Sequence, residues 1–190
     1  MKRALIWTTL LVSAIGAMVG GGLLWEGARA GALSESRMAP AFTHREANAW
    51  INSKPLTLAG LRGKVVLLDF WTFGCWNCYR SFPWLNDVEQ QFAGEPFQVI
   101  GIHAPEFDHE RVRDNVIAKV AEFDLHHPVM LDNDLSYWRA IGNRYWPTFY
   151  LLDKQGRIRA YTIGETHRGD HNATTIEQKI RELLAEDEQR

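Results

Sequence analysis

Apolar residues follow two different spacings along the chain, and each spacing predicts one kind of element. Continuous or nearly continuous apolar runs are typical of buried strands, and they occupy residues 65–70, 97–103, 148–152 and 157–163. Apolar residues spaced by three or four positions predict helices, and they occupy residues 78–92, residues 108–123 and a segment that starts near residue 174. Strands alternating with helices predict an α/β fold with helices on both faces of a sheet.

Turn and cap signals refine the second half of this pattern. Residues 153–156, Asp-Lys-Gln-Gly, lie between two predicted strands, so we expect these strands to pair as an antiparallel hairpin. Thr174 followed by Glu177 fits a capping box at the start of the last helix. Pro83 lies inside the first helix and predicts a kink there.

The amino terminus has the pattern of a membrane-targeting helix. Lys2 and Arg3 precede residues 4–25, which carry no charged side chain, and about 20 apolar residues span a bilayer as a helix. An uncleaved anchor and a signal peptide cleaved near Ala30 both fit residues 1–25. Either one places the rest of the chain on the periplasmic, or more generally extracytoplasmic, side of the membrane. Residues 26–48 are small and polar, which predicts a linker to a domain at 49–190.

Composition and net charge limit the classes of partner that the protein is expected to bind. Of 190 residues, 46% are hydrophobic, which is enough for a core without structural metal or several disulfides. The formal net charge is -2, whereas nucleic-acid binding favours a strongly basic surface. We therefore expect the membrane and other proteins as partners, and no nucleic acid.

The two cysteines of the chain are separated by only two residues, in the order Cys75, Trp76, Asn77, Cys78. A disulfide that closes so short a loop stabilises a fold by only about 2 kcal/mol, against about 4.7 for a 100-residue loop. Structural zinc needs four ligands, and no second cysteine pair is available. A redox-active pair is the interpretation that remains, and we expect no metal and no cofactor.

The predicted start of the first helix assigns different roles to the two sulfurs. Cys75 falls at or just before the first helical turn, where free N–H groups and the helix dipole stabilise a thiolate. A thiolate is the species that attacks a disulfide. We therefore expect Cys75 to attack and Cys78, one turn further in, to resolve the mixed disulfide.

These residues resemble the thioredoxin superfamily. The similarity rests on the run from Asp69 to Cys78, on Pro83, and on the later triplet Trp146, Pro147 and Thr148. Within the superfamily the chain is similar to the exported TlpA/ResA group, and most to its DipZ-like branch, over about residues 50–186. The resemblance implies a thioredoxin-like central mixed sheet flanked by helices on both faces.

The resemblance also implies site roles. Asp69 matches a buried acid that accepts the proton of the resolving thiol, although a strand-end carboxylate bound by backbone N–H groups is the alternative. Pro147 matches a cis-proline next to the disulfide, and an ordinary loop proline is the alternative. Trp146 and Thr148 flank this proline, and all three are expected to bind substrate.

Two departures from the family pattern concern proton transfer. Ser81 occupies a position that is often Glu in the ResA group, and residues 97–103 lack the Lys common in thioredoxins. Glu106 lies just past the end of a strand, at the sheet edge where we expect the site. It is a candidate replacement, with a solvated loop acid as the alternative, while His103 is expected to be a packed side chain.

Together these features predict an extracytoplasmic thiol–disulfide oxidoreductase. Exposed Trp76 and Trp146 would form an apolar patch beside Asn77 for protein substrates that contain disulfides. The dipeptide between the cysteines has no His or Lys to stabilise the thiolate strongly, which favours a reductant. The resemblance implies a membrane thiol-electron transporter as the electron donor, and targets such as the cysteines of apocytochromes, as in cytochrome c biogenesis.

Three other functions are compatible with parts of the sequence. A peroxidase of the peroxiredoxin type would use Thr72, three residues before Cys75, but needs a proline where Leu68 stands. A copper-delivery module of the same superfamily usually spaces its cysteines by three residues and adds a distant His. A non-catalytic domain would keep a permanent disulfide.

Overall fold

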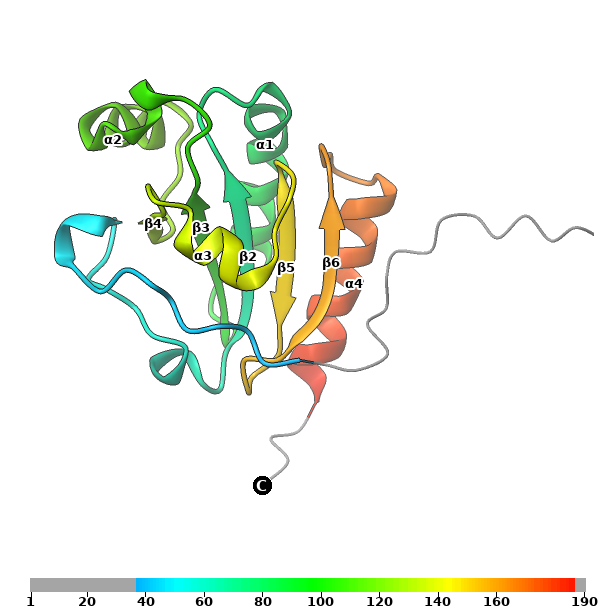
Figure 1. Ribbon diagram of the computed structural model, residues 1–190. Helices are drawn as coiled ribbons and strands as arrows, with labels where there is room; N and C mark the ends of the chain where they lie inside the picture. The colour runs from blue at the N-terminus through cyan, green and yellow to red at the C-terminus, as the bar shows by residue number, and fades with distance from the viewer. Residues whose placement is uncertain (1–36, 187–190) are drawn as a thin grey trace, which may run out of the picture.

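The computed structural model describes residues 37–186 and contains a six-stranded mixed sheet in the order β1-β4-β3-β2-β5-β6. Strands β2, β3 and β4 run parallel to one another, and the remaining pairs are antiparallel. The strands are β1 Trp50–Ile51, β2 Val65–Trp71, β3 Phe97–His103, β4 Val129–Leu131, β5 Thr148–Leu152 and β6 Ile158–Ile163. The expected mixed sheet and its terminal β5–β6 hairpin are confirmed (Figure 1).

Helices cover both faces of the sheet, as predicted. They are α1 Trp76–Gln91, α2 Arg113–Glu122, α3 Ser136–Ile141 and α4 His171–Ala185. Buried residues of α1, α2 and α4 share one apolar cluster, whereas those of α3 belong to a second cluster on the opposite face. The sheet therefore separates two cores.

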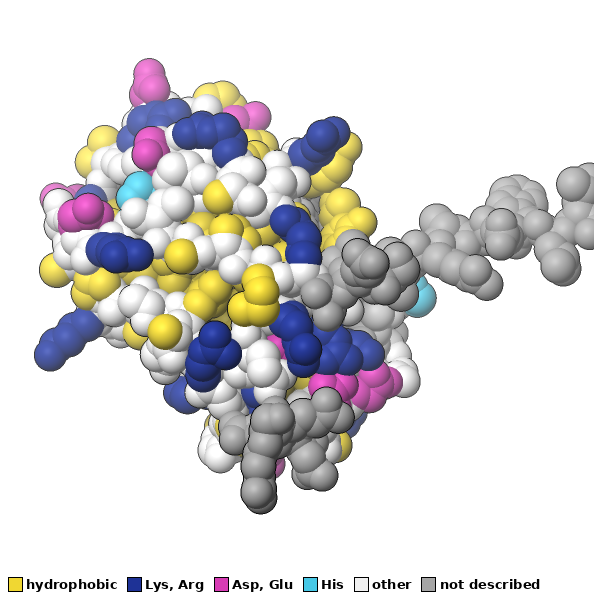
Figure 2. Space-filling view, turned by 60° about the horizontal axis from the view of Figure 1, so that its bottom comes forward, with side chains coloured by type: hydrophobic (Ala, Val, Ile, Leu, Met, Phe, Trp, Pro, Cys, Tyr) yellow, Lys and Arg dark blue, Asp and Glu magenta, His cyan; other side chains and the backbone are white. Residues whose placement is uncertain are grey.

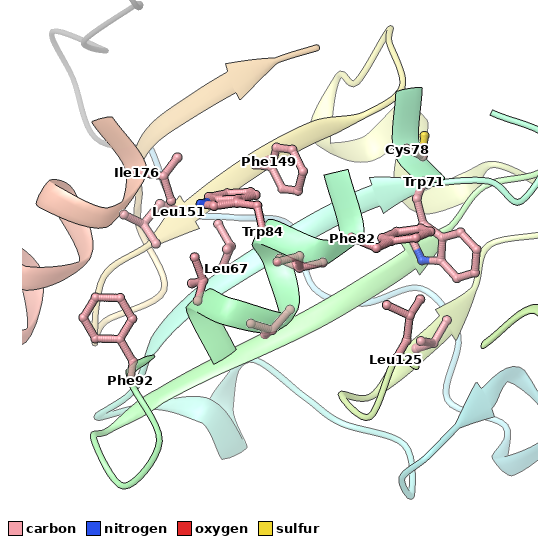
Figure 3. Close-up of a cluster of buried hydrophobic side chains, with 14 of the residues drawn as sticks. Leu67, Trp71, Cys78, Phe82, Trp84, Phe92, Leu125, Phe149, Leu151 and Ile176 are labelled. Carbon is pink, nitrogen blue, oxygen red and sulfur yellow. The ribbon is translucent and has the colours of Figure 1, made fainter. Parts of the chain in front are cut away.

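Strand β2 is the centre of both cores. All seven of its residues are buried, and their side chains alternate between the two faces. Leu67 and Trp71 contact the α1 side, and Leu68 and Phe70 contact the α3 side. Figure 3 shows the α1 side, with Cys78 at one end of the cluster near Trp71. Burial on both faces explains why the strand is an almost unbroken apolar run.

The helix predicted for residues 108–123 is divided. A 3-10 helix occupies Asp108–Arg111, and Val112 is extended before α2 begins. The Glu110 side chain turns inward and accepts backbone N–H groups of its own loop. This inward contact ends the first turn, which the apolar spacing alone does not reveal.

The last helix begins at His171 and not near Thr174. The Asp170 side chain caps it by accepting the N–H of Ala173. Glu177, expected in a capping box, instead accepts the indole N–H of Trp84 at 3.0 Å. The predicted capping box is therefore wrong, because a better cap lies four residues earlier and Glu177 has a tertiary partner.

Three short elements were not predicted, namely β1, β4 and α3. They contain two, three and six residues, which is too short for an apolar period to be recognised. Strand pairing holds β1 to β4 and β4 to β3. The Asp132 carboxylate holds the start of α3 by accepting the N–H groups of Tyr137 and Trp138.

The described part of the expected linker packs on the domain. Met38 forms a bridge with Arg157, Ala39 donates its N–H to the carbonyl of Gly156, and Phe42 is buried. Phe42 lies among Trp50 and Tyr137, so these few apolar residues attach an otherwise polar segment. The folded domain thus extends to residues that precede the predicted boundary at 49.

The predicted targeting helix at residues 1–25 lies outside the described residues. Within residues 37–186, no helix combines the length and apolar character needed to span a membrane. The export of the domain therefore stays a prediction.

Figure 2 brings forward the end of the molecule opposite the carboxyl end of β2. Separate Lys and Arg side chains lie on this face among hydrophobic and uncharged residues, with Asp and Glu near them.

Candidate active site

The cysteines form a disulfide at the amino end of α1. Cys75 caps the helix, and its Sγ accepts the N–H of Cys78 at 3.2 Å. Cys75 is partly exposed, whereas Cys78 is only 1% exposed. A sulfur at this position receives the positive end of the helix dipole, which stabilises its thiolate when the pair is reduced. The geometry makes one sulfur accessible and shields the other, as the sequence predicts.

Asp69 is a buried acid on the same side of the sheet as Cys78. It lies between Leu67 and Trp71 in the strand alternation, and it is 1% exposed. Neither carboxylate oxygen has a hydrogen-bond partner among the described residues. Burial raises the pKa of Asp69 to about 8, because the charged form loses its hydration. The alternative, a carboxylate bound by backbone N–H groups, is therefore wrong.

The loop before β5 contains a cis peptide bond between Trp146 and Pro147, as the resemblance implies. Thr148 pairs with Phe70 of β2, so the loop lies beside the strand end that leads to the cysteines (Figure 1). The Thr148 hydroxyl donates to the carbonyl of Tyr145 at 2.8 Å, which fastens the turn.

The two tryptophans differ in exposure, contrary to the prediction that both are exposed. Trp76 is 67% exposed. Trp146 is half-buried, because its indole N–H donates to the carbonyl of Ala104 at 3.1 Å and its ring lies 4.3 Å from that of Trp138. Trp146 thus holds the proline loop to the end of β3, and Trp76 is the exposed ring.

Other aromatic side chains extend the apolar surface around Trp76. Tyr79 lies 5.4 Å from Trp76 and 5.1 Å from Phe123, measured between ring centroids. We call Trp76, Tyr79 and Phe123 the aromatic surface. Beside it runs a groove between α1 and the end of α2, with Phe82 and Pro83 among its lining residues.

Glu106 does not supply a buried carboxylate. Its side chain is exposed, and only its backbone N–H enters the site, donating to Glu110 at 2.6 Å. The buried acid is Glu110, which also accepts the N–H groups of Phe107 at 2.9 Å and Gly74 at 2.7 Å. Glu110 was not predicted as a site residue, since it lies in a segment with the apolar spacing of a surface helix.

Glu110 is ionised and surrounded by donors. Burial by itself would raise its pKa, but the backbone N–H groups of Phe107, Glu106 and Gly74 and the Thr72 hydroxyl outweigh burial and lower the pKa below the usual value. His103 is packed as expected, stacked on Phe73. Burial lowers the pKa of His103 to about 4 despite the nearby Glu110 charge. A neutral His103 and a charged Glu110 therefore lie behind the cysteine loop.

The remaining candidate positions have structural contacts. Asn77 is exposed, and its carbonyl accepts the Ser81 hydroxyl at 2.8 Å. Ser81 in turn accepts the N–H of Thr166 at 2.9 Å, so this position links α1 to the loop after β6. Thr72 is fully buried against Glu110 and His103 and does not face the surface, where a peroxidase would need it.

Metal-ligating groups do not gather at the cysteines in the described residues. His44, Asp132 and Asp134 form a three-residue cluster elsewhere. Both oxygens of Asp132 accept N–H groups of α3, so the cluster already has a structural role.

An accessible sulfur at a helix start, its shielded partner and a cis-proline loop together form the CxxC site of a thioredoxin-like domain, the kind of site that thiol–disulfide oxidoreductases carry. Residues 34–179 match the Redoxin family model, and the chain belongs to this family. Within it, the chain fits the TlpA/ResA type.

The chain is similar to Protein DipZ of Mycobacterium tuberculosis, with 41% identity over 138 residues, 71% of this chain and 19% of that protein. It thus spans about a fifth of the length of this relative. It is also similar to the thiol-disulfide oxidoreductase YkuV of Bacillus subtilis, at 25% identity over 74% of this chain and 90% of YkuV. The solution structure of an oxidized thioredoxin-like protein matches with TM-score 0.66 and 25% identity, covering 79% of this chain and 96% of that one.

Proposed function

We propose that the protein reduces disulfides of exported proteins on the extracytoplasmic side of a membrane. The observation that carries this proposal is the unequal exposure of the pair, with Cys75 partly open and Cys78 buried. A permanent structural disulfide gains nothing from an accessible sulfur at a helix start, whereas disulfide exchange requires one.

In the first step the Cys75 thiolate attacks a substrate disulfide. A bond forms between Cys75 and one substrate sulfur, and the other substrate sulfur leaves as a thiolate that takes up a proton. The amino end of α1 stabilises the attacking charge. The mixed disulfide places the substrate next to the cis-proline loop.

In the second step Cys78 resolves the mixed disulfide. The Cys78 thiol gives its proton to Asp69 and attacks Cys75, which forms the Cys75–Cys78 disulfide. The second substrate sulfur leaves as a thiolate and takes up a proton from solvent, so the substrate gains two electrons and two protons over both steps. Asp69 is suited to this role because it lies on the face that Cys78 packs against and has no competing hydrogen bond among the described residues. Its pKa near 8 is close to that of a thiol.

Substrate segments would bind in extended form along the loop of Trp146, Pro147 and Thr148, with Trp76 and Asn77 on the other side of the cysteines. The aromatic surface supports a protein substrate, because exposed aromatic rings are enriched at protein interfaces. Glu106 lies at the edge of the proposed substrate-binding area. Its exposed carboxylate would contact the substrate and would not take up the Cys78 proton.

The charges around the pair support electron flow from the protein to its substrate. Glu110 holds a negative charge against the loop that precedes Cys75, and a nearby anion disfavours a thiolate. A less stabilised thiolate makes the reduced form a better electron donor. A membrane thiol-electron transporter would then re-reduce the pair, with no cofactor, and residues 4–25 would anchor the domain.

Trapping tests the proposal. A Cys78→Ser variant of the full chain, expressed in the native host, should accumulate mixed disulfides with exported proteins, because it can attack but cannot release. A Cys75→Ser variant is the matched control and should trap none. A reduction potential as oxidising as about -120 mV would contradict the reducing direction.

A further inference from the structure

Unpartnered polar atoms gather beneath the cysteines on the α1 side of the sheet. Both oxygens of Asp69, Nε1 of Trp71 and Nε2 of His127 have no hydrogen-bond partner among the described residues. All three side chains are at most 1% exposed. A buried polar group without a partner costs about 1–3 kcal/mol, so three of them at one place need a functional reason.

Gly101 brings these groups together. It pairs with Asp69 across the parallel strands β2 and β3, which lie about 4.8 Å apart, so both residues face the same side. A Cβ added to Gly101 would lie 2.9 Å from Trp71 Nε1 and 3.3 Å from His127 Nε2. The indole and the imidazole therefore occupy the space above Gly101 that a larger residue would fill, one strand away from Asp69 on the same face.

His127 connects this place to the surface. Its Nδ1 lies 3.3 Å from Oε2 of Glu89 on α1, and the exposed fractions of the two side chains are 0% and 31%. When Nδ1–H donates to Glu89, Nε2 becomes the acceptor. The acceptor nitrogen then lies above Gly101, on the face of the sheet that Asp69 shares, and the donor nitrogen meets a carboxylate in contact with water.

We propose that His127 relays protons between Asp69 and Glu89, and through Glu89 to solvent, directly or through one bridging water. The proposal rests on the proposed function, in which Asp69 accepts the Cys78 proton. The Asp69 carboxyl gives its proton to Nε2 while the proton on Nδ1 passes to the Glu89 carboxylate, and no electron moves. The Trp71 N–H on the same face, unpartnered within residues 37–186, is then available to the ionised Asp69 through a bridging water.

A route of this kind is needed because Asp69 holds a proton at neutral pH. Its pKa of about 8 means that it must lose a proton to solvent before it can accept one from Cys78. Two other buried titratable groups lie near this face. His103 of β3 stays neutral, with Nε2 3.4 Å from the Thr72 hydroxyl, Nδ1 without a partner among the described residues, and its ring 4.8 Å from that of Trp71. Glu110 accepts the N–H groups of its loop. Of the two histidines on this face, His127 is the one that meets a partly exposed carboxylate.

The experiment compares His127→Gln with His126→Gln in the full chain. A glutamine at position 127 keeps a hydrogen-bond donor and an acceptor, but it cannot take up one proton while it releases another. His126 is the control position because it is the exposed neighbouring histidine. Rapid-mixing oxidation of the reduced protein by a small aromatic disulfide should be about tenfold slower in His127→Gln at pH 7. The reduction potential should not change, and the deficit should disappear above pH 8, where Asp69 is already ionised.

Two further variants separate the possible failures. Glu89→Gln keeps His127 but removes the carboxylate through which the proton reaches solvent, so it should also slow the reaction. This variant tests the relay if His127→Gln does not fold. Wild-type rates in both variants, with Asp69→Asn slow, would overturn the relay alone. Wild-type rates in Asp69→Asn would contradict the proposal that Asp69 accepts the Cys78 proton, and the relay would fail with it.

Discussion

Glu110 accepts the backbone N–H of Gly74, the residue immediately before Cys75, at 2.7 Å. A carboxylate that follows β3 thus fixes the loop that follows β2. The same carboxylate accepts the N–H groups of Glu106 and Phe107. One buried charge therefore sets the position of the cysteine loop relative to the loop after β3.

Replacing Glu110 with Gln should lower stability by about 1–3 kcal/mol at pH 7, because a neutral amide accepts fewer N–H groups and presents its own. The folded pKa of Glu110 lies below 4.5, so its stabilising contribution is present above that pH and is lost as the pH falls. Urea unfolding at several pH values checks this. The difference between variant and wild type should shrink in acid, and exposed Glu106→Gln should match wild type throughout.

The same substitution should make the protein a weaker reductant. Removing a negative charge behind Cys75 favours its thiolate, which stabilises the reduced form. Equilibration with glutathione or dithiothreitol measures the potential. A potential that stays unchanged or becomes more reducing in Glu110→Gln would show that this charge does not set the direction of the reaction.

Asp69→Asn should increase stability above neutral pH. Because the folded pKa is raised to about 8, the folded wild type binds a proton more tightly than the unfolded chain. Its stability therefore falls as the pH rises from about 4 to about 8 and then levels off. The variant should lack this fall, so the two proteins should have similar stability near pH 4 and diverge above it. If the stabilities of the two proteins changed in parallel with pH, Asp69 would not be a buried acid with a raised pKa.

Gly74→Ala should displace the cysteine loop. A Cβ at this position would lie 2.5 Å from Oε1 of Glu110, so either the loop or the carboxylate must move. We expect lower thermal stability and slower disulfide exchange. Gly60→Ala is the matched control, since its Cβ meets only a Thr57 oxygen, at 3.3 Å. Equal losses of stability and exchange rate in both variants would mean that the contact between Gly74 and Glu110 does not position the cysteine loop.

Trp76→Ala should weaken substrate binding without unfolding the protein, because its ring is 67% exposed. Loss of one aromatic contact at an interface corresponds to about a fivefold rise in KM for a protein disulfide substrate, with kcat little changed. Val112→Ala, at a residue of similar exposure, is the control. A small disulfide that does not reach the aromatic surface should react equally with both variants.

The sequence was sufficient for the elements with strong local patterns. The apolar run of β2, the spacing within α1 and the turn before β6 predicted the sheet centre, the cysteine helix and the hairpin. The position of Cys75 at the helix start followed from the spacing within α1, which depends on neighbours along the chain. The buried Asp69 and the cis Trp146–Pro147 bond were implied by the resemblance to the thioredoxin superfamily.

Features that depend on distant contacts were not predictable in this way. Glu110 looks like a surface acid until the loop of Gly74 is placed against it. Nothing in the sequence near Trp146 indicates that its indole N–H donates a hydrogen bond to Ala104. Residues around Phe42 are polar on average and are held by a few rings from other segments. In each case the partner is far away in the chain.

The attachment of Met38 and Ala39 at the β5–β6 turn places the start of the described chain far from the cysteines. This turn lies beside the amino end of β2, whereas the cysteines follow its carboxyl end. Seven residues of strand separate these two ends by about 20 Å. If residues 4–25 hold the chain in a bilayer, the chain enters the domain at the end opposite the reactive sulfur, and the length of β2 separates that entry from the site.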